Sequence, residues 1–159
     1  ARMPKPIFKK NEINKIIKDS IDLMKTNDKD IDINFVYEKI YFVNSDIEQL
    51  NRVFINLFKN SIESLKEKSE KVGNFQKKIN VEIQLINDYI NIIVNDNGTG
   101  FISNDPKIFS KPYFTTKKEG SGLGLSIVEK ILNDHNGFIE FIPQKEGAKI
   151  KILLPKYVD

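Results

Sequence analysis

The stretch from Ser45 to about Lys66 constrains the fold most, because it predicts a long helix with one apolar face. Ser45-Asp46-Ile47-Glu48 has the capping-box pattern, in which the serine caps the helix start and the glutamate reaches back. At 100° per residue, the apolar residues share one face: Ile47, Leu50, Phe54, Leu57, Phe58, Ile62 and Leu65. The opposite side carries Arg52, Asn56, Asn60 and Glu63. The helix therefore has to bury one side and can present the other to a ligand.

Shorter elements are expected before this helix. Asn11 to Met24 has apolar residues at helical spacing, with Asn11 as the N-cap. Ile31 to Tyr37 alternates as a half-buried strand, and Ile40 to Val43 is expected to be its short partner. The charged segment from Lys66 to Lys78 contains Gly73 and is interpreted as a solvated loop.

The second half of the chain predicts two hairpins and one more helix. Strands are expected at 79–86 and 89–95, with a turn at Asn87-Asp88. A helix is expected over 123–136, ended by Gly137. Strands at 138–142 and 148–154 close the chain as a hairpin around residues 144–147.

The composition fits one globular domain that does not bind nucleic acid. The chain has 159 residues, of which 40% are hydrophobic and 30% charged, and its net charge of +3 comes from lysines interleaved with acids. The absence of cysteine excludes disulfides and thiolate chemistry, and fits a cytoplasmic setting. No stretch approaches the roughly 20 apolar residues of a membrane helix. Residues 1–10 are expected to be a connector from a preceding domain, and residues 11–159 one domain.

A turn rich in glycine follows the strand that contains Ile90, Ile92 and Val94. Its sequence is Asp96-Asn-Gly98-Thr-Gly100. The glycines allow positive φ angles and the close approach of a flat ligand to the backbone. A carboxylate at the floor of such a pocket would accept a hydrogen bond from the exocyclic amine of adenine and reject guanine. The alternative is an ordinary Asp-Asn-Gly turn.

A second glycine-rich segment, Gly120-Ser121-Gly122-Leu123-Gly124-Leu125, opens the helix at 123–136. It is neither a P-loop nor a Rossmann fingerprint, because the lysine and the spacing that those motifs need are missing. Free N–H groups at a helix start suit phosphates. The long loop before it, at about 101–121, is expected to act as a lid, with Thr115, Thr116 and Lys117 meeting the terminal phosphates.

Two asparagines on the long helix, Asn56 and Asn60, lie one turn apart on its polar side. An amide oxygen suits Mg²⁺, which predicts Asn60 as the metal ligand and Asn56 as a lining residue. The alternative is a pair of exposed polar residues. His135 could attract attention as a phosphoacceptor, but its place at a helix C-terminus favours a structural role.

Taken together, these motifs resemble the ATP-binding catalytic domain of bacterial sensor histidine kinases, within the gyrase–Hsp90–kinase–MutL superfamily. Residues 54–61 resemble the N box, residues 96–101 the G1 box, residues 109–117 the F box and residues 120–125 the G2 box. The helix ending in His135-Asn136-Gly137 is similar to a family helix that commonly ends in His-Gly-Gly. The lid sequence is closest to the nitrogen-regulation branch.

The resemblance implies an α/β (α+β) fold of the Bergerat type, in which three helices cover one face of a mixed, mostly antiparallel sheet. It implies ATP and Mg²⁺ as cofactors, with Asn56, Asn60 and Lys117 as candidate catalytic residues. The candidate cofactor-binding residues are Asn56, Lys59, Asn60, Glu63, Asp96, Gly98, Gly100, Phe101, Thr115, Thr116, Lys117, Gly120, Ser121, Gly122, Leu123, Gly124 and Leu125.

The resemblance also implies a reaction and its partners. The γ-phosphoryl group would pass to a histidine of the dimerisation domain of the same kinase, and a response regulator receiver domain would be the next partner. The parent protein would be dimeric and anchored in the bacterial inner membrane. ATP-hydrolysing relatives carry a glutamate one turn before the magnesium asparagine, where this chain has Asn56. An ATP-hydrolysing domain and a non-catalytic nucleotide sensor remain the alternatives.

Overall fold

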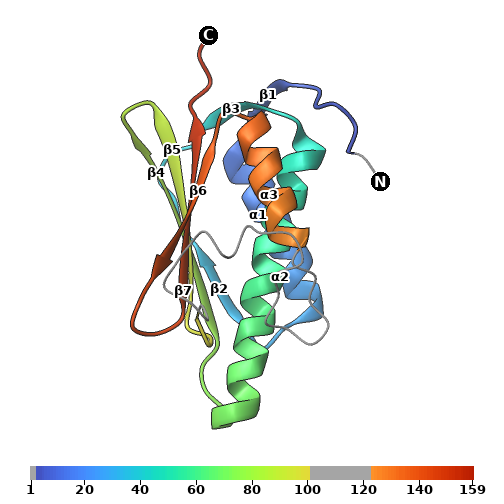
Figure 1. The fold of residues 1–159 in the computed structure, drawn as a ribbon. Coiled ribbons are helices and arrows are strands. Elements are labelled where there is room, and N and C mark those ends of the chain that lie inside the picture. The colour runs from blue at the N-terminus through green and yellow to red at the C-terminus, as the bar shows by residue number, and fades with distance from the viewer. Residues whose placement is uncertain (1–2, 101–122) are drawn as a thin grey trace.

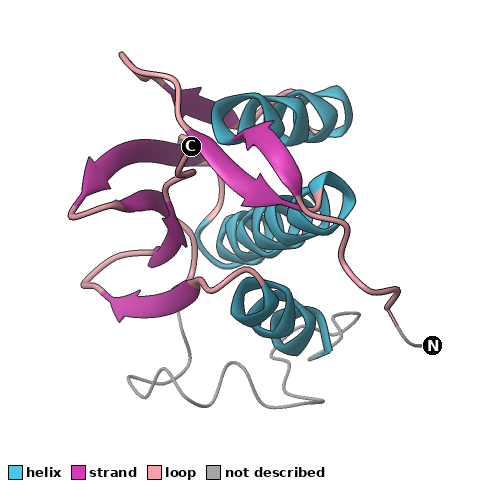
Figure 2. Cartoon of the chain, turned by 90° about the horizontal axis from the view of Figure 1, so that it is seen from above, coloured by secondary structure: helices cyan, strands magenta, loops and turns pink. Residues whose placement is uncertain are grey.

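The computed structural model describes residues 3–100 and 123–159, which form two layers. The helices are α1 (Ile13–Asn27), α2 (Ile47–Val72) and α3 (Leu123–Asp134). The strands are β1 (Lys9–Glu12), β2 (Asp32–Phe35), β3 (Phe42–Ser45), β4 (Lys78–Ile86), β5 (Tyr89–Asp96), β6 (Phe138–Pro143) and β7 (Ala148–Pro155). All three helices lie on one face of the main sheet, as Figures 1 and 2 show.

The main sheet has the strand order β2-β4-β5-β7-β6. Only the pairing of β2 with β4 is parallel, whereas β4, β5, β7 and β6 pair antiparallel to their neighbours. The buried side of the sheet carries the alternating residues of the central strand β5, since Ile90, Ile92 and Val94 are at most 1% exposed. These residues pack against the apolar faces of the helices. The architecture confirms the predicted mixed sheet covered on one face by three helices.

Both predicted hairpins are present. Asn87 and Asp88 both have positive φ angles, 49° and 67°, at the turn between β4 and β5, as a tight two-residue hairpin needs. At the end of α3, Asn136 adopts φ 59° and the N–H of Gly137 donates to the carbonyl of Leu132 at 2.7 Å. This is a Schellman ending, in which asparagine takes the left-handed position that glycine usually fills.

The start of α2 differs from the predicted capping box. Ser45 belongs to β3 and is buried, and Asp46 is the N-cap, with its side chain accepting from the backbone N–H of Gln49 at 3.1 Å. Ile47, the first residue of the helix, is 47% exposed and is not part of the buried face, contrary to the prediction. The other six predicted apolar-face residues are buried.

The end of α2 also differs, because the helix continues to Val72 rather than stopping near Lys66. Lysine, glutamate and serine are compatible with a solvated helix, and nothing breaks it before Gly73, which has φ 83°. The predicted loop at 66–78 therefore shrinks to residues 73–77. In Figure 1 the last turns of α2 extend below the sheet.

The first strands depart from the prediction as well. Asn11 lies in β1 and is not a helix cap, and its side chain donates to the carbonyl of Ser45 at 2.9 Å. β3 pairs antiparallel with β1 and not with β2. β2 is only four residues long, because it pairs with the first part of β4. Within the part of the chain that the structure describes, no helix is both long and apolar enough to cross a bilayer.

Candidate nucleotide-binding site

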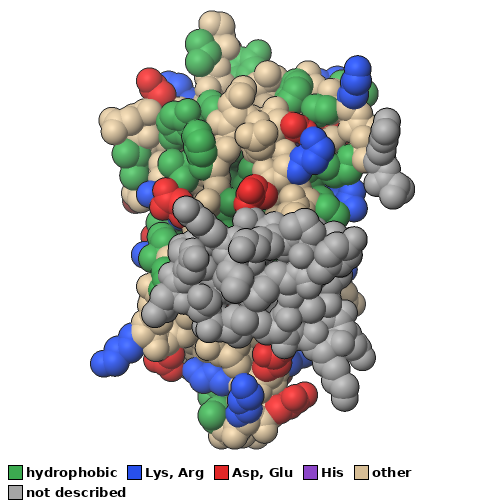
Figure 3. Space-filling view, in the orientation of Figure 1, with side chains coloured by type: hydrophobic (Ala, Val, Ile, Leu, Met, Phe, Trp, Pro, Cys, Tyr) green, Lys and Arg blue, Asp and Glu red, His purple; other side chains and the backbone are tan. Residues whose placement is uncertain are grey.

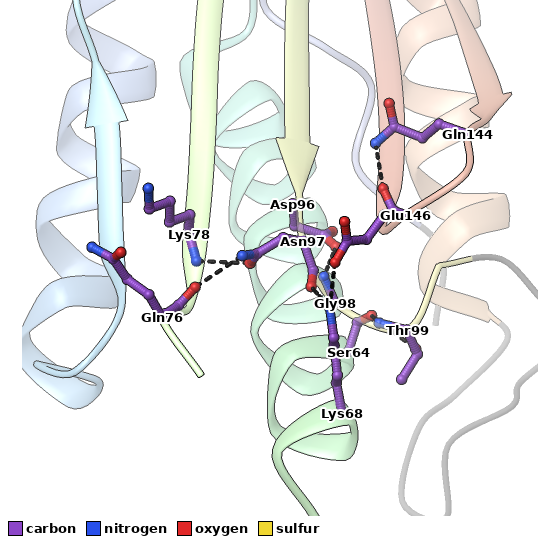
Figure 4. A network of polar contacts seen from close by, with 10 residues as sticks. All are labelled: Ser64, Lys68, Gln76, Lys78, Asp96, Asn97, Gly98, Thr99, Gln144 and Glu146. Atoms are coloured by element: carbon purple, nitrogen blue, oxygen red, sulfur yellow. Dashed lines mark hydrogen bonds and ion pairs between the residues drawn. The ribbon is translucent and has the colours of Figure 1, made fainter. Parts of the chain in front are cut away.

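Asp96 is the last residue of β5, on the side of the sheet that faces the helices. The residue is buried, and its Oδ1 accepts a hydrogen bond from the backbone N–H of Gly98 at 2.9 Å. This bond turns the chain immediately after the strand and fixes the orientation of the carboxylate. The segment from Asp96 to Gly100 is called the base loop below (Figure 4).

The base loop is in direct contact with helix α2. A Cβ atom at Gly98 would lie 2.9 Å from the carbonyl carbon of Ser64 and 3.0 Å from the nitrogen of Leu65, so no larger residue fits. The N–H of Thr99 donates to Oγ of Ser64 at 2.9 Å, and the two hydroxyl oxygens lie 3.0 Å apart. Glycine is therefore needed at position 98 because the base loop packs closely against α2. It does not make room for a ligand there.

This contact brings the predicted acidic residue close to the predicted amides. Ser64 lies one helical turn after Asn60 and two turns after Asn56, so all three lie along one side of α2. Asn56, Asn60 and Glu63 are half-buried, whereas Lys59 is exposed. The base loop therefore lies next to the side of α2 that carries the two asparagines.

Asn97 braces the base loop on the side of the sheet. Its Oδ1 accepts from the backbone N–H of Lys78 at 2.9 Å, and its Nδ2 donates to the carbonyl of Gln76 at 2.8 Å. Lys68 of α2 donates to the carbonyl of Asn97 at 2.8 Å and forms an ion pair with Glu146 at 3.1 Å. Both side chains therefore hold the loop in place.

The turn between β6 and β7 closes a third side. Gly100 and Gly147 have φ angles of 82° and 76°, which favour glycine. A Cβ at Gly100 would lie 2.8 Å from the carbonyl oxygen of Gly147, and one at Gly147 would overlap the carbonyl of Asp96. The positive φ angle and the close approach explain why a glycine is required at position 100. The β6–β7 turn that Gly100 contacts is distant from it in the sequence.

The segment that the sequence predicts to bind phosphates is described in part. Helix α3 begins at Leu123, as the glycine motif predicted, and a Cβ at Gly124 would meet no atom within 4 Å. Leu125 is half-buried and packs against the core. The remaining predicted residues lie outside the described residues: Phe101, Thr115, Thr116, Lys117, Gly120, Ser121 and Gly122.

His135 has the structural position that the sequence favoured. It is buried, its Nδ1 lies 2.7 Å from the carbonyl of Ile131, and its Nε2 accepts from the backbone N–H of Asp46 at 3.1 Å. This pattern requires a neutral ring with its proton on Nδ1. With both nitrogens engaged, the ring is not available as a phosphoacceptor.

The donor set in the described residues fits magnesium but not a metal held by the protein alone. Residues 3–100 and 123–159 contain no group of three His, Cys, Asp or Glu that could hold an ion. Mg²⁺ commonly takes one or two protein oxygens and completes its shell with phosphates and water. An amide oxygen of Asn60 beside a bound triphosphate would meet that need.

Comparison with known proteins agrees with this geometry. The profile of the histidine kinase-, DNA gyrase B- and HSP90-like ATPases matches residues 45–158, which include α2, the base loop and α3. The chain belongs to this family. Its relatives include a putative NtrY-like sensor histidine kinase of Rickettsia conorii, 36% identical over 96% of this chain, and the nitrogen regulation protein NtrY of Azorhizobium caulinodans, 30% identical over 97%.

A solved structure of the same family supports the fold. The nucleotide-free catalytic domain of histidine kinase ThkA superposes with a TM-score of 0.80, 26% identity, and coverage of 94% of this chain and 96% of that one. This chain spans only 25% and 20% of the length of the two relatives named above. The similarity to nitrogen-regulation proteins agrees with the branch that the lid sequence suggested.

Sequence reasoning missed four residues that contact or belong to the base loop: Ser64, Lys68, Thr99 and Gly147. A signal for the first two was present, because Asn56, Asn60, Ser64 and Lys68 follow one another at intervals of four. The repeat was not recognised because the helix was predicted to end near Lys66, before Lys68. No pattern in the sequence pointed to Gly147, whose role depends on how the β6–β7 turn meets the base loop.

Proposed function

We propose that this chain binds ATP with Mg²⁺ and is the catalytic part of a sensor histidine kinase. The observation that carries the proposal is the contact of the base loop with α2, one turn from Asn60. This contact supports a site in which the buried carboxylate of Asp96 and the amides of α2 bind one ligand from two sides. Membership of the ATPase family and relatives named as sensor histidine kinases support the same conclusion.

Each wall has a separate task in this proposal. Asp96 accepts a hydrogen bond from the exocyclic amine of adenine, because its carboxylate is fixed by the Gly98 N–H. Asn60 holds Mg²⁺, with Asn56 and Glu63 lining the same pocket and Lys59 beside it. The N–H groups at the start of α3 and Lys117 bind the phosphates. Magnesium, when bound, neutralises the charge that develops on the phosphates.

In the protein of which this chain is a part, the γ-phosphoryl group passes to a histidine nitrogen of a dimerisation domain. The bond from γ-phosphorus to the bridging oxygen breaks, ADP leaves, and a P–N bond forms. A response regulator receiver domain then takes the group. The domain works on the cytoplasmic side of a dimeric protein anchored in the inner membrane.

One residue favours a kinase over an ATP-hydrolysing domain. Activating water for attack on the γ-phosphate needs a general base, and Asn56 occupies the position one turn before Asn60. An amide cannot accept a proton at neutral pH. We therefore expect slow release of phosphate when the chain is incubated with ATP alone.

The test is to mix the chain with labelled ATP and a separately purified dimerisation domain that carries the acceptor histidine. Acid-labile label on that domain is the expected result, and a histidine-to-alanine acceptor is the control. Tight ATP binding without transfer would favour a nucleotide sensor, and steady phosphate release would favour a hydrolase. At an ATP concentration 100 times its Kd, binding should stabilise the fold by about 2.7 kcal/mol.

A further inference from the structure

We infer that Ser64 is a positioning residue for the nucleotide, because it sets where the base loop lies relative to the magnesium-binding side of α2. The inference rests on the proposed function. Ser64 and Lys68 continue the row that Asn56 and Asn60 begin on α2. In the proposed function the first two members of this row serve the phosphates and the metal, and the last two contact the loop that carries Asp96.

The contacts of Ser64 and Lys68 are made to the backbone of the base loop. Ser64 accepts from the N–H of Thr99, and Lys68 donates to the carbonyl of Asn97. Two successive turns of α2 therefore hydrogen-bond to the base loop on both sides of Gly98. Figure 4 shows Ser64 and Lys68 reaching the loop from the same helix.

These contacts restrict the movement of the base loop relative to α2. Gly98 is in close contact with the backbone of Ser64 and Leu65, so the loop cannot move closer to α2. The two hydrogen bonds to Ser64 keep it from moving away. Asp96 is coupled to the same point, because its carboxylate accepts from the N–H of Gly98.

The consequence concerns a ligand that must touch both walls at once. The base of ATP meets Asp96, and its phosphates and magnesium meet Asn60, so the two contacts form together only at one separation. Preorganised geometry increases affinity because less freedom is lost on binding. Loss of the Ser64 hydroxyl should loosen the base side and leave the metal side intact.

The experiment compares Ser64→Ala with Ser61→Ala, using calorimetric titration of the whole chain with ATP in Mg²⁺ and in EDTA. Ser61 lies on the same helix and is equally buried, at 3% exposure against 8% for Ser64. We expect Ser64→Ala to bind ATP about tenfold more weakly, as the loss of these hydrogen bonds would cause. The ratio of Kd in EDTA to Kd in Mg²⁺ should stay the same, and Ser61→Ala should bind as the natural chain does.

Changes at Thr99 provide the rescue series. Thr99→Val removes the hydroxyl contact with Ser64 but keeps the backbone N–H, so its affinity should fall between those of the natural chain and Ser64→Ala. Thr99→Ser restores the hydroxyl and should recover most of the affinity. Hydrogen exchange at the Thr99 amide, measured without nucleotide, should be faster in Ser64→Ala than in Ser61→Ala.

The outcomes separate the two claims. If the natural chain does not bind ATP, the proposed function fails. If the natural chain binds ATP and Ser64→Ala binds it equally well, the function stands and the positioning role is wrong. A weaker Ser64→Ala whose affinity loss vanishes at a temperature where it is fully folded would also overturn the inference, because the serine would then act on stability alone.

Discussion

The two ends of helix α2 are held to the rest of the molecule in different ways. At its N-terminal end, Asp46 accepts from the N–H of Ile7 at 2.9 Å and donates its own N–H to His135, whose ring meets that of Phe8 edge-on at 5.0 Å. The entering chain, α2 and the end of α3 thus meet at one cluster. We call Ile7, Phe8, Asp46 and His135 the upper joint.

At its other end, α2 holds the base loop through the Ser64 and Lys68 contacts. The upper joint engages both ring nitrogens of its histidine and both oxygens of its aspartate with protein groups. The lower contact uses hydrogen bonds to the backbone of the base loop, one helical turn after the half-buried Asn60. One end of the helix therefore joins three segments of the fold, and the other contacts the loop for which we propose a role in nucleotide binding.

On the face shown in Figure 3, most of the apolar side chains in view lie in the upper part, together with several charged ones, and charged side chains are prominent at the lower end. Exposed apolar residues near the upper joint include Ile7, Phe8, Phe42, Ile47 and Val158. Changes at the two ends should consequently have separable effects on folding and on nucleotide affinity.

The largest expected effect belongs to the lower end. Asp96→Asn keeps the size of the side chain but replaces an acceptor oxygen with a donor amide, so it should reduce ATP affinity by at least about 100-fold. Calorimetric titration measures this change, and circular dichroism should show an unchanged fold. Retained affinity would refute the adenine role of Asp96.

Asn60→Ala should have the second largest effect on nucleotide binding. Removal of the amide oxygen should abolish the dependence of ATP affinity on magnesium, because the metal then lacks its protein ligand. The measurement is Kd in Mg²⁺ against Kd in EDTA, with Ser61→Ala as the control for a change on the same helix. A preserved magnesium effect would mean that another residue holds the metal.

A substitution in the upper joint should lower the stability of the fold and leave ATP affinity unchanged. His135→Phe keeps an aromatic ring beside Phe8 but leaves the N–H of Asp46 without its acceptor, which costs about 1–3 kcal/mol of unfolding free energy. Urea denaturation measures the loss. ATP affinity below the unfolding transition should be unchanged, and a large fall in affinity would show that the two ends are coupled.

The smallest effect depends on pH. Burial raises the pKa of Asp46, but hydrogen bonds from the backbone N–H groups of Ile7, Gln49 and Glu48 to its carboxylate hold that pKa below its ordinary value. The folded state then binds the proton less readily than the unfolded state. The stability from this carboxylate is therefore complete above the unfolded pKa of about 3.9, and is lost as pH falls through the lower folded value.

Asp46→Asn tests this directly, because asparagine caps a helix about as well as aspartate. Near neutral pH the variant should be less stable than the natural chain, because only the carboxylate has two acceptor oxygens for the N–H groups of Ile7 and Gln49. The difference should shrink as the pH is lowered below 4. A difference that does not change with pH would assign it to packing rather than to charge.

The sequence predicted the strand hairpins and the buried residues of β5, because strict alternation and turn residues are local signals. The roles that it predicts for Asp96 and for the asparagines on α2 stay predictions. It misplaced the α2 cap by one residue, because Ser45 and Asp46 are both good caps and only the pairing of β3 with β1 decides between them. Charged helix ends such as Lys66 to Val72 carry no periodic apolar signal.

The contacts that assemble the site were beyond the reach of local patterns. Gly98 and Gly100 were singled out, but their neighbours are Ser64 and Gly147, each at least 34 residues away in the chain. Which residues meet there depends on how α2 crosses the sheet. The predicted lid residues at 101–121 lie outside the described residues, and their roles stay predictions.

The parallel pairing of β2 with β4 has a consequence for how the chain folds. β2 emerges first during synthesis, yet its partner starts at Lys78, after β3 and the whole of α2. Closing so long an intervening segment costs entropy, which slows the step. The edge strand β2 should thus be the last strand of the main sheet to pair during folding. On brief heating, its hydrogen bonds to β4 should break before those of the central strands.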